Sequence, residues 1–247
     1  MPWRNTRVPY RILVSEVMLQ QTGIERVKSK YASFVRAFPG FRALAAASVE
    51  EVLAAWKGLG YNRRALALRE AAQLVTETHH GRMPRTVKTL MELPGVGHAT
   101  ASAVLVYSFN APLAFIETNI RRVFIHCFFP RGRQVTDAKL MPLVERTLDR
   151  DNPREWYYAL MDYGAMLGKT TMNANTRSAR YRKQAAFEGS LRQLRGRILA
   201  AILERGPATE VQIARAIGSA DKRLGRALAR LVEEGFLLHK GRRYCFR

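Results

Sequence analysis

Hydrophobic residues recur every three or four positions through most of the first 170 residues, the spacing that collects side chains on one face of an α-helix. Strand patterns are nearly absent before residue 235. Amphipathic helices are therefore expected over the segments 63–75, 86–93, 100–109, 118–128, 136–149 and 153–167. This pattern predicts a main body that is all-α.

Another helix is expected between Pro9 and Gly23, and its apolar face contains one carboxylate, Glu16. A charged side chain among apolar neighbours is unfavourable unless it has a partner or a function. Loss of solvent would raise the pKa of Glu16, so that it could hold a proton and later release it. The alternative is a structural ion pair with an arginine. A capping box at Ser48 and Glu51 predicts the start of a further helix.

The last 57 residues follow a different pattern. Three helices are expected over 191–203, 210–217 and 220–234, followed by a basic hairpin with a tight turn at Gly241. Three helices and a hairpin form a winged-helix-like α+β module, which binds either DNA or another protein. The candidate DNA contacts of this module are Lys222, Arg223, Arg226, Arg230, Lys240 and Arg242.

Charge narrows the class of partner. The 247 residues include 41 Lys and Arg against 20 Asp and Glu, a formal charge of +21, which favours nucleic acid. No apolar run reaches the length of a membrane span, and the N-terminus does not resemble a secretory signal, so a cytoplasmic, nucleoid-associated protein without a membrane partner is expected. Two cysteines, Cys127 and Cys245, exclude a disulfide framework and a four-thiolate metal site.

The charge is unevenly distributed along the chain. Residues 1–176 carry 24 basic and 14 acidic side chains, whereas the shorter segment 177–247 carries 17 and 6. This step predicts a domain boundary near residue 177. The expected organisation is a helical body over 1–176, an Arg-rich linker or DNA-contacting segment over 177–190, and the winged-helix-like domain over 191–247.

A glycine-containing loop between two predicted helices is a candidate phosphate-binding hairpin. Gly95 and Gly97 allow backbone N–H groups to approach an anion, and the following helix presents its N-terminal amides there. An ordinary tight helix–helix turn explains this loop equally well. The candidate DNA-backbone contacts are Leu93, Gly95, Val96, Gly97, His98 and Ala99.

Six motifs occur in a characteristic order: Pro9-Tyr10, Ser15–Thr22, Gly58–Tyr61, Leu93–Gly97, Asn119–Val123 and Met161–Met166. With this set, residues 2 to about 168 resemble the helix-hairpin-helix DNA glycosylases of the endonuclease III superfamily, and among them most nearly the adenine-specific mismatch glycosylases (the MutY family). The resemblance implies a mainly α, two-lobed fold: a six-helix lobe over about 12–125, and a second lobe from the N-terminus plus about 126–176. It also implies that the target nucleotide is flipped out of the duplex.

The resemblance also implies roles for particular residues. Glu16 matches the catalytic carboxylate that protonates the leaving base and then activates water. Gln20 and Gln21 match residues that enter the DNA helix near the target or its partner base. Tyr61 matches an aromatic wedge beside the opposite base, although a core role is an alternative, and Asn119 matches a polar residue of the cleft.

This chain departs from the family at several places. The catalytic aspartate is replaced by Glu117, which can still stabilise a sugar cation but lies one methylene further out. Bifunctional relatives have a Schiff-base lysine where this chain has Ala99, so no lyase activity is expected. Asp162 is interpreted as a hydrogen-bond anchor or a cap and not as a catalyst.

Family members usually hold an iron–sulfur cluster on four cysteines near the end of the helical body. The corresponding stretch, 167–187, has no cysteine, so no cluster is expected and the Arg-rich segment is a candidate replacement as a backbone anchor. No other cofactor is expected, and the hairpin stays a candidate place for a monovalent cation. The winged-helix-like segment stands where the adenine enzymes usually have a domain that checks for oxidised guanine.

The expected function is base excision repair by a monomeric, monofunctional DNA glycosylase that acts on double-stranded DNA with a mispaired or damaged base, adenine being favoured. One alternative is a mismatch uracil, thymine or modified-base glycosylase of the same fold. Another is a non-catalytic DNA-binding protein on a glycosylase scaffold, an alternative raised by Glu117 and Ala99.

Overall fold

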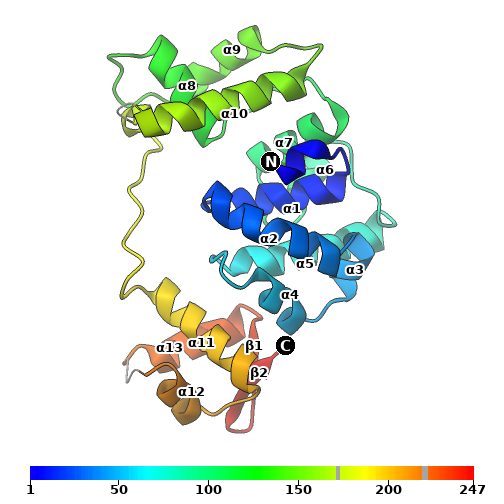
Figure 1. The fold of residues 1–247 in the computed structure, drawn as a ribbon, viewed down its shortest axis with the longest axis vertical. Helices are drawn as coiled ribbons and strands as arrows, with labels where there is room; N and C mark the ends of the chain where they lie inside the picture. The colour runs from blue at the N-terminus through cyan, green and yellow to red at the C-terminus, as the bar shows by residue number, and fades with distance from the viewer. Residues whose placement is uncertain (171–172, 219–221) are drawn as a thin grey trace. The chain divides into compact units, whose positions relative to one another are not determined.

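The computed structural model describes residues 1–170, 173–218 and 222–247, whose regular structure is almost entirely helical (Figure 1). It confirms the predicted helical body followed by a small module with one hairpin. None of the described helices is both long and apolar enough to cross a membrane.

Two compact units make up the structure, and each combines separate parts of the chain. The first unit contains Met1–Pro2, Val17–Arg82 and Ala185–Arg247, and the second contains Trp3–Glu16 and Met83–Gln184. Helix α1 (Pro9–Leu19) contributes to both units, because the division falls within it. The boundaries inferred from charge, near residues 176 and 190, remain predictions.

The first part of the first unit is built from α2 (Ile24–Ala37), α3 (Phe41–Ala46), α4 (Val49–Trp56) and α5 (Arg63–Thr78). Helices α3 and α4 pack on α5, and α2 packs on α4, where the rings of Phe34 and Trp56 meet edge to face at 5.7 Å. The predicted capping box is present: Ser48 Oγ accepts from the Glu51 amide at 3.1 Å, and Glu51 Oε2 accepts from the Ser48 amide at 2.7 Å. These bonds satisfy amides that the helix itself cannot pair.

Helices α2 and α3 are absent from the elements predicted above. The signal for α2 exists, since Val27, Tyr31 and Phe34 are spaced by four and three residues and all three are buried. Helix α3 has six residues, too few for a periodic pattern to stand out.

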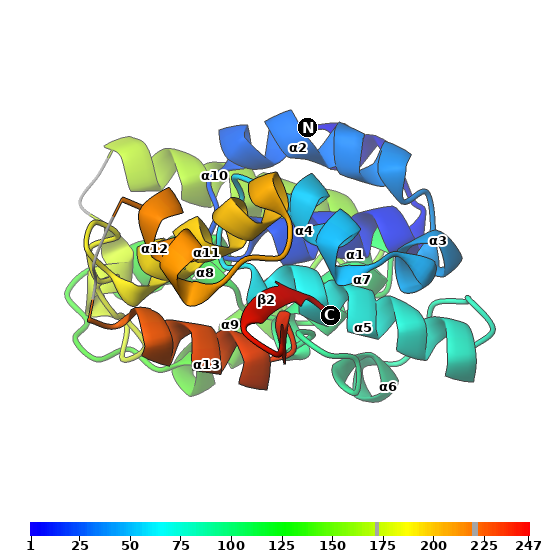
Figure 2. The same cartoon turned by 90° about the horizontal axis from the view of Figure 1, so that it is seen from below.

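The C-terminal part of the first unit has the elements expected of a winged helix: α11 (Leu191–Arg205), α12 (Glu210–Ala216), α13 (Leu224–Glu233), β1 (Leu237–Lys240) and β2 (Arg243–Phe246). The two strands pair antiparallel, and β1 packs on α13 (Figure 2). A bridge between Ala208 and Tyr244 ties the loop before α12 to the hairpin. The helix expected from residue 220 begins at Leu224, and residues 220 and 221 lie outside the described part of the chain.

The second unit contains most of the short helix η1 (Pro2–Asn5), because this unit begins at Trp3. Its other helices are α6 (Val87–Met91), α7 (His98–Phe109), α8 (Thr118–Phe128), α9 (Asp137–Thr147), α10 (Pro153–Thr170) and η2 (Ala174–Arg177). Helices α8 and α10 form its most extensive helix pair and lie side by side (Figure 1). Gly164 makes this approach possible, because a Cβ atom there would lie 2.5 Å from the carbonyl oxygen of Asn119. The predicted helices of this region are confirmed to within a few residues at each end.

Candidate active site

Glu16 lies on α1 among buried neighbours. Leu13 and Val14 are fully buried and Val17 is nearly so, whereas Glu16 keeps part of its surface exposed. The pKa of Glu16 is raised to about 8, mainly by loss of solvent and to a smaller extent by the Glu117 carboxylate, while the charge of Arg4 opposes the shift. Glu16 therefore holds its proton at neutral pH, as its position in an apolar helix face predicted.

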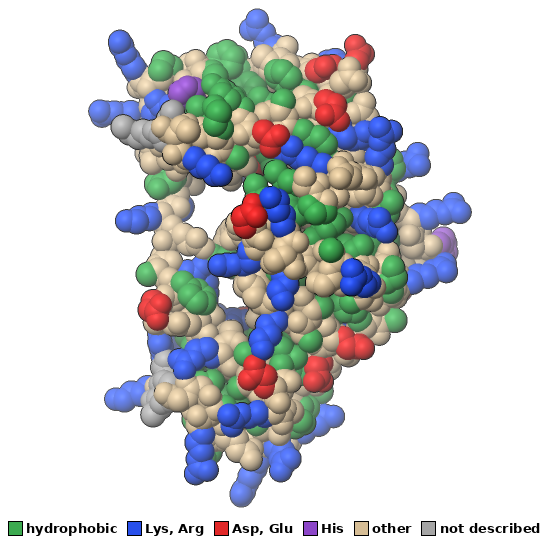
Figure 3. Space-filling model, viewed as in Figure 1, with side chains coloured by type: hydrophobic (Ala, Val, Ile, Leu, Met, Phe, Trp, Pro, Cys, Tyr) green, Lys and Arg blue, Asp and Glu red, His purple; other side chains and the backbone are tan. Residues whose placement is uncertain are grey.

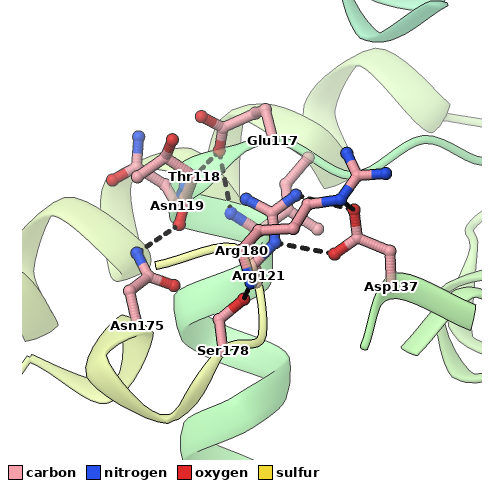
Figure 4. Close-up of polar contacts among 9 residues, drawn as sticks. Glu117, Thr118, Asn119, Arg121, Asp137, Asn175, Ser178 and Arg180 are labelled. Atoms are coloured by element: carbon pink, nitrogen blue, oxygen red, sulfur yellow. Dashed lines mark hydrogen bonds and ion pairs between the residues drawn. The ribbon is translucent and has the colours of Figure 1, made fainter. Parts of the chain in front are cut away.

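Glu117 is the N-cap of α8. Its Oε1 accepts hydrogen bonds from the backbone amides of Asn119 at 2.5 Å and Ile120 at 2.8 Å (Figure 4). Burial raises the pKa of Glu117 above its ordinary value, and these two hydrogen bonds and the charges of Arg121 and Arg122 oppose this shift without cancelling it. The long side chain thus folds back onto the helix start, and the carboxylate is held at a fixed place at the positive end of the helix dipole.

Asn119 is fixed by Arg122, one turn further along α8. Arg122 Nη1 donates to Asn119 Oδ1 at 2.9 Å and to the carbonyl of Gly164 on α10 at 2.6 Å. The absence of a side chain at Gly164 lets α10 come close enough for this contact. The Met161–Met166 motif therefore contributes to the site through its glycine, and Asn119 and Glu117 are brought together at the start of α8.

A second polar group includes Arg4, which has no counterpart among the predicted site residues. Arg4 forms a bidentate pair with Asp162, both N–O distances being 2.7 Å, and its guanidinium lies 4.5 Å from the ring centre of Tyr158. Tyr158 stacks on Tyr107 at 4.8 Å. The pairing confirms the interpretation of Asp162 as a hydrogen-bond anchor, and it holds a cation where it acts on the charge of Glu16.

The 93–97 loop forms a tight hairpin between α6 and α7. Gly95 has φ of +77°, and Gly97 is the N-cap of α7 and makes no side-chain cap. Both glycines and His98 are exposed, Ala99 is partly exposed, and Leu93 and Val96 are buried and anchor the loop. Exposed amides at a helix start are the geometry that suits a phosphate.

The other predicted contacts with the bases belong to the first unit. Gln21 is exposed with φ of +54°, in the turn after α1, and Tyr61 has φ of +48° in the loop before α5. Arg64 joins the two loops: Nη1 donates to the carbonyls of Val17 and Met18 at 2.8 Å and of Gln20 at 2.5 Å. The same guanidinium donates through Nη2 to the carbonyl that precedes Tyr61, at 3.0 Å.

Arg64 was not among the predicted site residues, since nothing local in the sequence marks an arginine as a link between loops. Burial lowers its pKa to about 10, so it keeps its charge at neutral pH. Arg192 of α11 was also not predicted. It donates to the Tyr61 hydroxyl and places its guanidinium 5.3 Å from the ring centre.

The basic residues predicted for the winged-helix-like module, Lys222, Arg223, Arg226, Arg230, Lys240 and Arg242, are all exposed. Arg223 also donates to the carbonyl of Gly189 at 3.0 Å. Lys and Arg side chains are distributed over the whole face in Figure 3, including the part formed by this module. This surface suits the phosphate backbone of a nucleic acid.

The residues present do not fit an iron–sulfur cluster. The chain has two cysteines, and they lie in different units, Cys127 in the second and Cys245 in the first. Within the described ranges, no group of three or more His, Cys, Asp or Glu could hold a metal ion.

Comparison with known proteins agrees with this geometry. Residues 14–146 match the family model of the HhH-GPD superfamily of base excision DNA repair proteins. The chain is 36% identical over 225 residues to the adenine DNA glycosylase of Mycobacterium tuberculosis, a match that covers 81% of this chain and 72% of the relative. It is 32% identical over 255 residues to the adenine DNA glycosylase of Mycolicibacterium smegmatis, covering 96% and 87% of the two chains.

Among solved structures, that of a thermostable thymine-DNA glycosylase matches with a TM-score of 0.61 and 32% identity, covering 67% of this chain and 78% of that one. The family match spans more than half of the chain, and the relatives extend over most of its length. The chain therefore belongs to the HhH-GPD superfamily of base excision DNA repair proteins.

Proposed function

We propose that this protein is a monofunctional DNA glycosylase that removes mispaired adenine by hydrolysing its N-glycosidic bond. The observation that carries the proposal is the pair of carboxyl groups in one unit, Glu16 and Glu117, of which the first has a pKa of about 8 and the second is bound by two amides. Adenine as the substrate base is supported by the two relatives named above. Both are adenine DNA glycosylases, and this chain matches most of the length of each.

Glu16 is the general acid and then the general base in this proposal. The protonated carboxyl donates its proton to a ring nitrogen of the flipped base, and the C1′–N bond breaks with its electron pair going to the base. Water then adds to C1′ of the sugar cation and returns a proton to the Glu16 carboxylate. A pKa near neutrality suits both steps, because the group has to lose and regain one proton in each turnover.

Glu117 stabilises the positive charge that develops on the sugar. The amides of Asn119 and Ile120 and the nearby charges of Arg121 and Arg122 favour its anionic form. An anion that is held before the reaction starts does not have to reorganise when the cation forms. The hydrogen bonds from α8 therefore support an electrostatic role for Glu117.

DNA binding is proposed to use the 93–99 hairpin and the basic surface of the C-terminal module, with Gln20, Gln21, Tyr61 and Asn119 near the bases. Arg192 and Arg64 both lie within 5.5 Å of the Tyr61 ring centre, and Tyr61 is partly exposed, which supports a role at the DNA over a role in the core. The protein is proposed to act as a monomer.

Lyase activity is not part of the proposal, because the side chain at the position of the Schiff-base lysine is that of Ala99. Without an amine at this position, the sugar cation is captured by water and the DNA strand stays intact. Strand breaks should appear only after treatment with alkali.

Incubation with labelled duplexes that contain A, T or U opposite each normal base and 8-oxoguanine, followed by alkali, tests the function directly. Breaks confined to adenine mispairs are expected. Breaks at T or U mispairs would favour a mismatch thymine or uracil glycosylase, a second candidate function that the similarity to a thymine-DNA glycosylase supports. Binding of every duplex with no base loss would identify a non-catalytic DNA-binding protein.

A further inference from the structure

The stretch that the family usually devotes to an iron–sulfur cluster is occupied here by a polar segment. Residues 173–180, called the brace below, lie in the second unit and include the short helix η2. The chain has no cysteine between residues 167 and 187. The brace must therefore be held by interactions other than metal ligation.

Hydrogen bonds attach the brace to the region of α8 and α9. Its backbone pairs with Val135, which accepts from the Ala179 amide at 3.0 Å and donates to the Arg177 carbonyl at 2.8 Å. Arg180 pairs with Asp137 at 3.2 Å, and the same carboxylate binds Arg121 of α8 at 2.7 Å (Figure 4). The brace is thus fixed at its C-terminal end beside the helix that starts at Glu117.

The N-terminal end of the brace contacts the first turn of α8 itself. Asn175 Nδ2 donates to the carbonyl of Thr118 at 3.0 Å, directly after Glu117 in the sequence (Figure 4). Asn173 Oδ1 accepts from Arg122 Nε at 3.2 Å, and Arg122 in turn holds Asn119. Two side chains of the brace therefore support the turn whose amides bind the Glu117 carboxylate.

Burial of the Asn175 side chain is energetically unfavourable if this residue contributes only to stability. It is 7% exposed, and its Oδ1 is buried without a hydrogen-bond partner among the described residues. The free-energy cost of an unsatisfied buried acceptor exceeds the net gain from one ordinary hydrogen bond. An apolar side chain of the same size would avoid this cost, so the feature that distinguishes asparagine is its donor to Thr118.

We propose that Asn175 is a positioning residue, which holds the first turn of α8 so that the amides of Asn119 and Ile120 keep the Glu117 carboxylate in place. In this way the brace supports the site by hydrogen bonds in the stretch where relatives use a cluster. The inference rests on the proposed function, in which Glu117 stabilises the sugar cation.

The test compares Asn175→Ala and Asn175→Leu with the wild-type chain in single-turnover excision from an adenine mispair. Both variants lose the donor, and Leu keeps the branched shape and the number of heavy atoms while it removes the unpaired oxygen. We expect the excision rate to fall about tenfold in both, since small displacements of a reacting group are costly. The acidic limb of the pH–rate profile should also move to higher pH, because weaker amide bonds raise the pKa of Glu117. Affinity for the duplex should change less than about twofold, because Asn175 is buried.

Thr176→Ala is the matched control. Thr176 is exposed in the same segment, and its hydroxyl donates to the carbonyl of Asn173 at 2.8 Å without reaching α8. This variant should keep the wild-type rate and pH profile. Asn175→Leu should also keep or raise the melting temperature, which separates loss of positioning from loss of folding.

Amide hydrogen exchange at Asn119 and Ile120 provides a readout that does not depend on activity. Exchange should be faster in both Asn175 variants than in the wild type and in Thr176→Ala. Wild-type rates, profiles and exchange in Asn175→Leu would overturn the inference. If the wild-type protein releases no base from any duplex, the proposed function fails, and exchange at the two amides still decides whether Asn175 fixes the turn.

Discussion

Glu16 lies within helix α1 among apolar neighbours, whereas Glu117 lies just before helix α8 and is bound by two backbone amides. Both carboxyl groups belong to the second unit, and burial raises the pKa of both. Only Glu117 has hydrogen bonds that oppose the shift; for Glu16 the opposing influence is the charge of Arg4 alone.

This difference shows how one residue type can serve two steps of a reaction. Burial without hydrogen bonds favours the neutral acid, which has a proton to give, while amide hydrogen bonds favour the anion and fix its position. The environment of Glu16 therefore suits a group that changes protonation state. The environment of Glu117 suits a group whose carboxylate is held in one place by two backbone amides.

Replacement of Glu16 should have the largest effect. Glu16→Gln keeps the size of the side chain but cannot transfer a proton, so single-turnover excision should fall about 10³-fold. Affinity for the same duplex, measured by fluorescence anisotropy, should stay within a few-fold of the wild type. Base loss at an undiminished rate in this variant would exclude Glu16 as the acid and base.

Changes at Glu117 should be less severe and should separate charge from position. Glu117→Gln keeps an amide-binding oxygen and loses the charge, for which we expect a rate loss of about 10²-fold. Glu117→Asp keeps the charge and a good N-cap but withdraws the carboxylate by one methylene, for which we expect about tenfold. A wild-type rate in Glu117→Gln would refute electrostatic stabilisation by this residue.

The two carboxylates also show what could be predicted from the sequence. Helix α8 was expected over 118–128 and spans Thr118–Phe128, and the unusual placement of Glu16 was visible as one carboxylate in an apolar face. Both follow from local patterns, which determine where helices lie and which face they bury. The capping role of Glu117 was not foreseen, although a carboxylate one residue before a predicted helix is a recognisable N-cap signal.

Contacts between distant segments could not be predicted in this way. Arg4 pairs with Asp162, 158 residues away, and Arg64 donates to carbonyls 44 to 47 residues away, in the last turn of α1 and directly after it. Backbone carbonyls have no sequence identity, so an arginine that binds them leaves no pattern. The contacts of the brace could not be predicted either. The sequence showed a polar, Arg-rich segment without cysteines, but no local pattern indicated that Asn175 would bind the carbonyl of Thr118.

Replacement of Glu16 should have a moderate effect on stability, and the size of this effect should depend on pH. In the folded protein Glu16 has a pKa of about 8, above the ordinary value of 4.5, so at any pH between these values unfolding releases a proton. The stability associated with Glu16 is therefore complete below about pH 4.5 and is lost as the pH rises to 8. Glu16→Gln should raise the free energy of unfolding by about 1–2 kcal/mol at pH 8.5 and by much less at pH 5.

Thermal unfolding at the two pH values measures this difference. Glu25→Gln is a suitable control, because Glu25 is exposed on α2 and pairs only with Lys28 at 2.9 Å in the described structure. Its effect on the melting temperature should be small at both pH values. A Glu16→Gln variant that is no more stable than the wild type at pH 8.5 would show that burial does not disfavour the charge of Glu16.

Replacement of Arg4 should have the smallest effect on excision, because Arg4 acts mainly on the pKa of Glu16. Arg4 lowers the pKa of Glu16 and is not among the main causes of the shift at Glu117. Arg4→Gln should therefore raise the pKa of Glu16, and the alkaline limb of the pH–rate profile, where the general acid loses its proton, should move to higher pH. The acidic limb, which reports on the Glu117 anion, should stay in place.

Asp162→Asn is the matched control, since it breaks the same bidentate pair but leaves the positive charge of Arg4, and it should not move the alkaline limb to higher pH. A shift of both limbs in Arg4→Gln would mean that the two carboxyl groups titrate as a coupled pair, and the division of roles between them would then have to be abandoned.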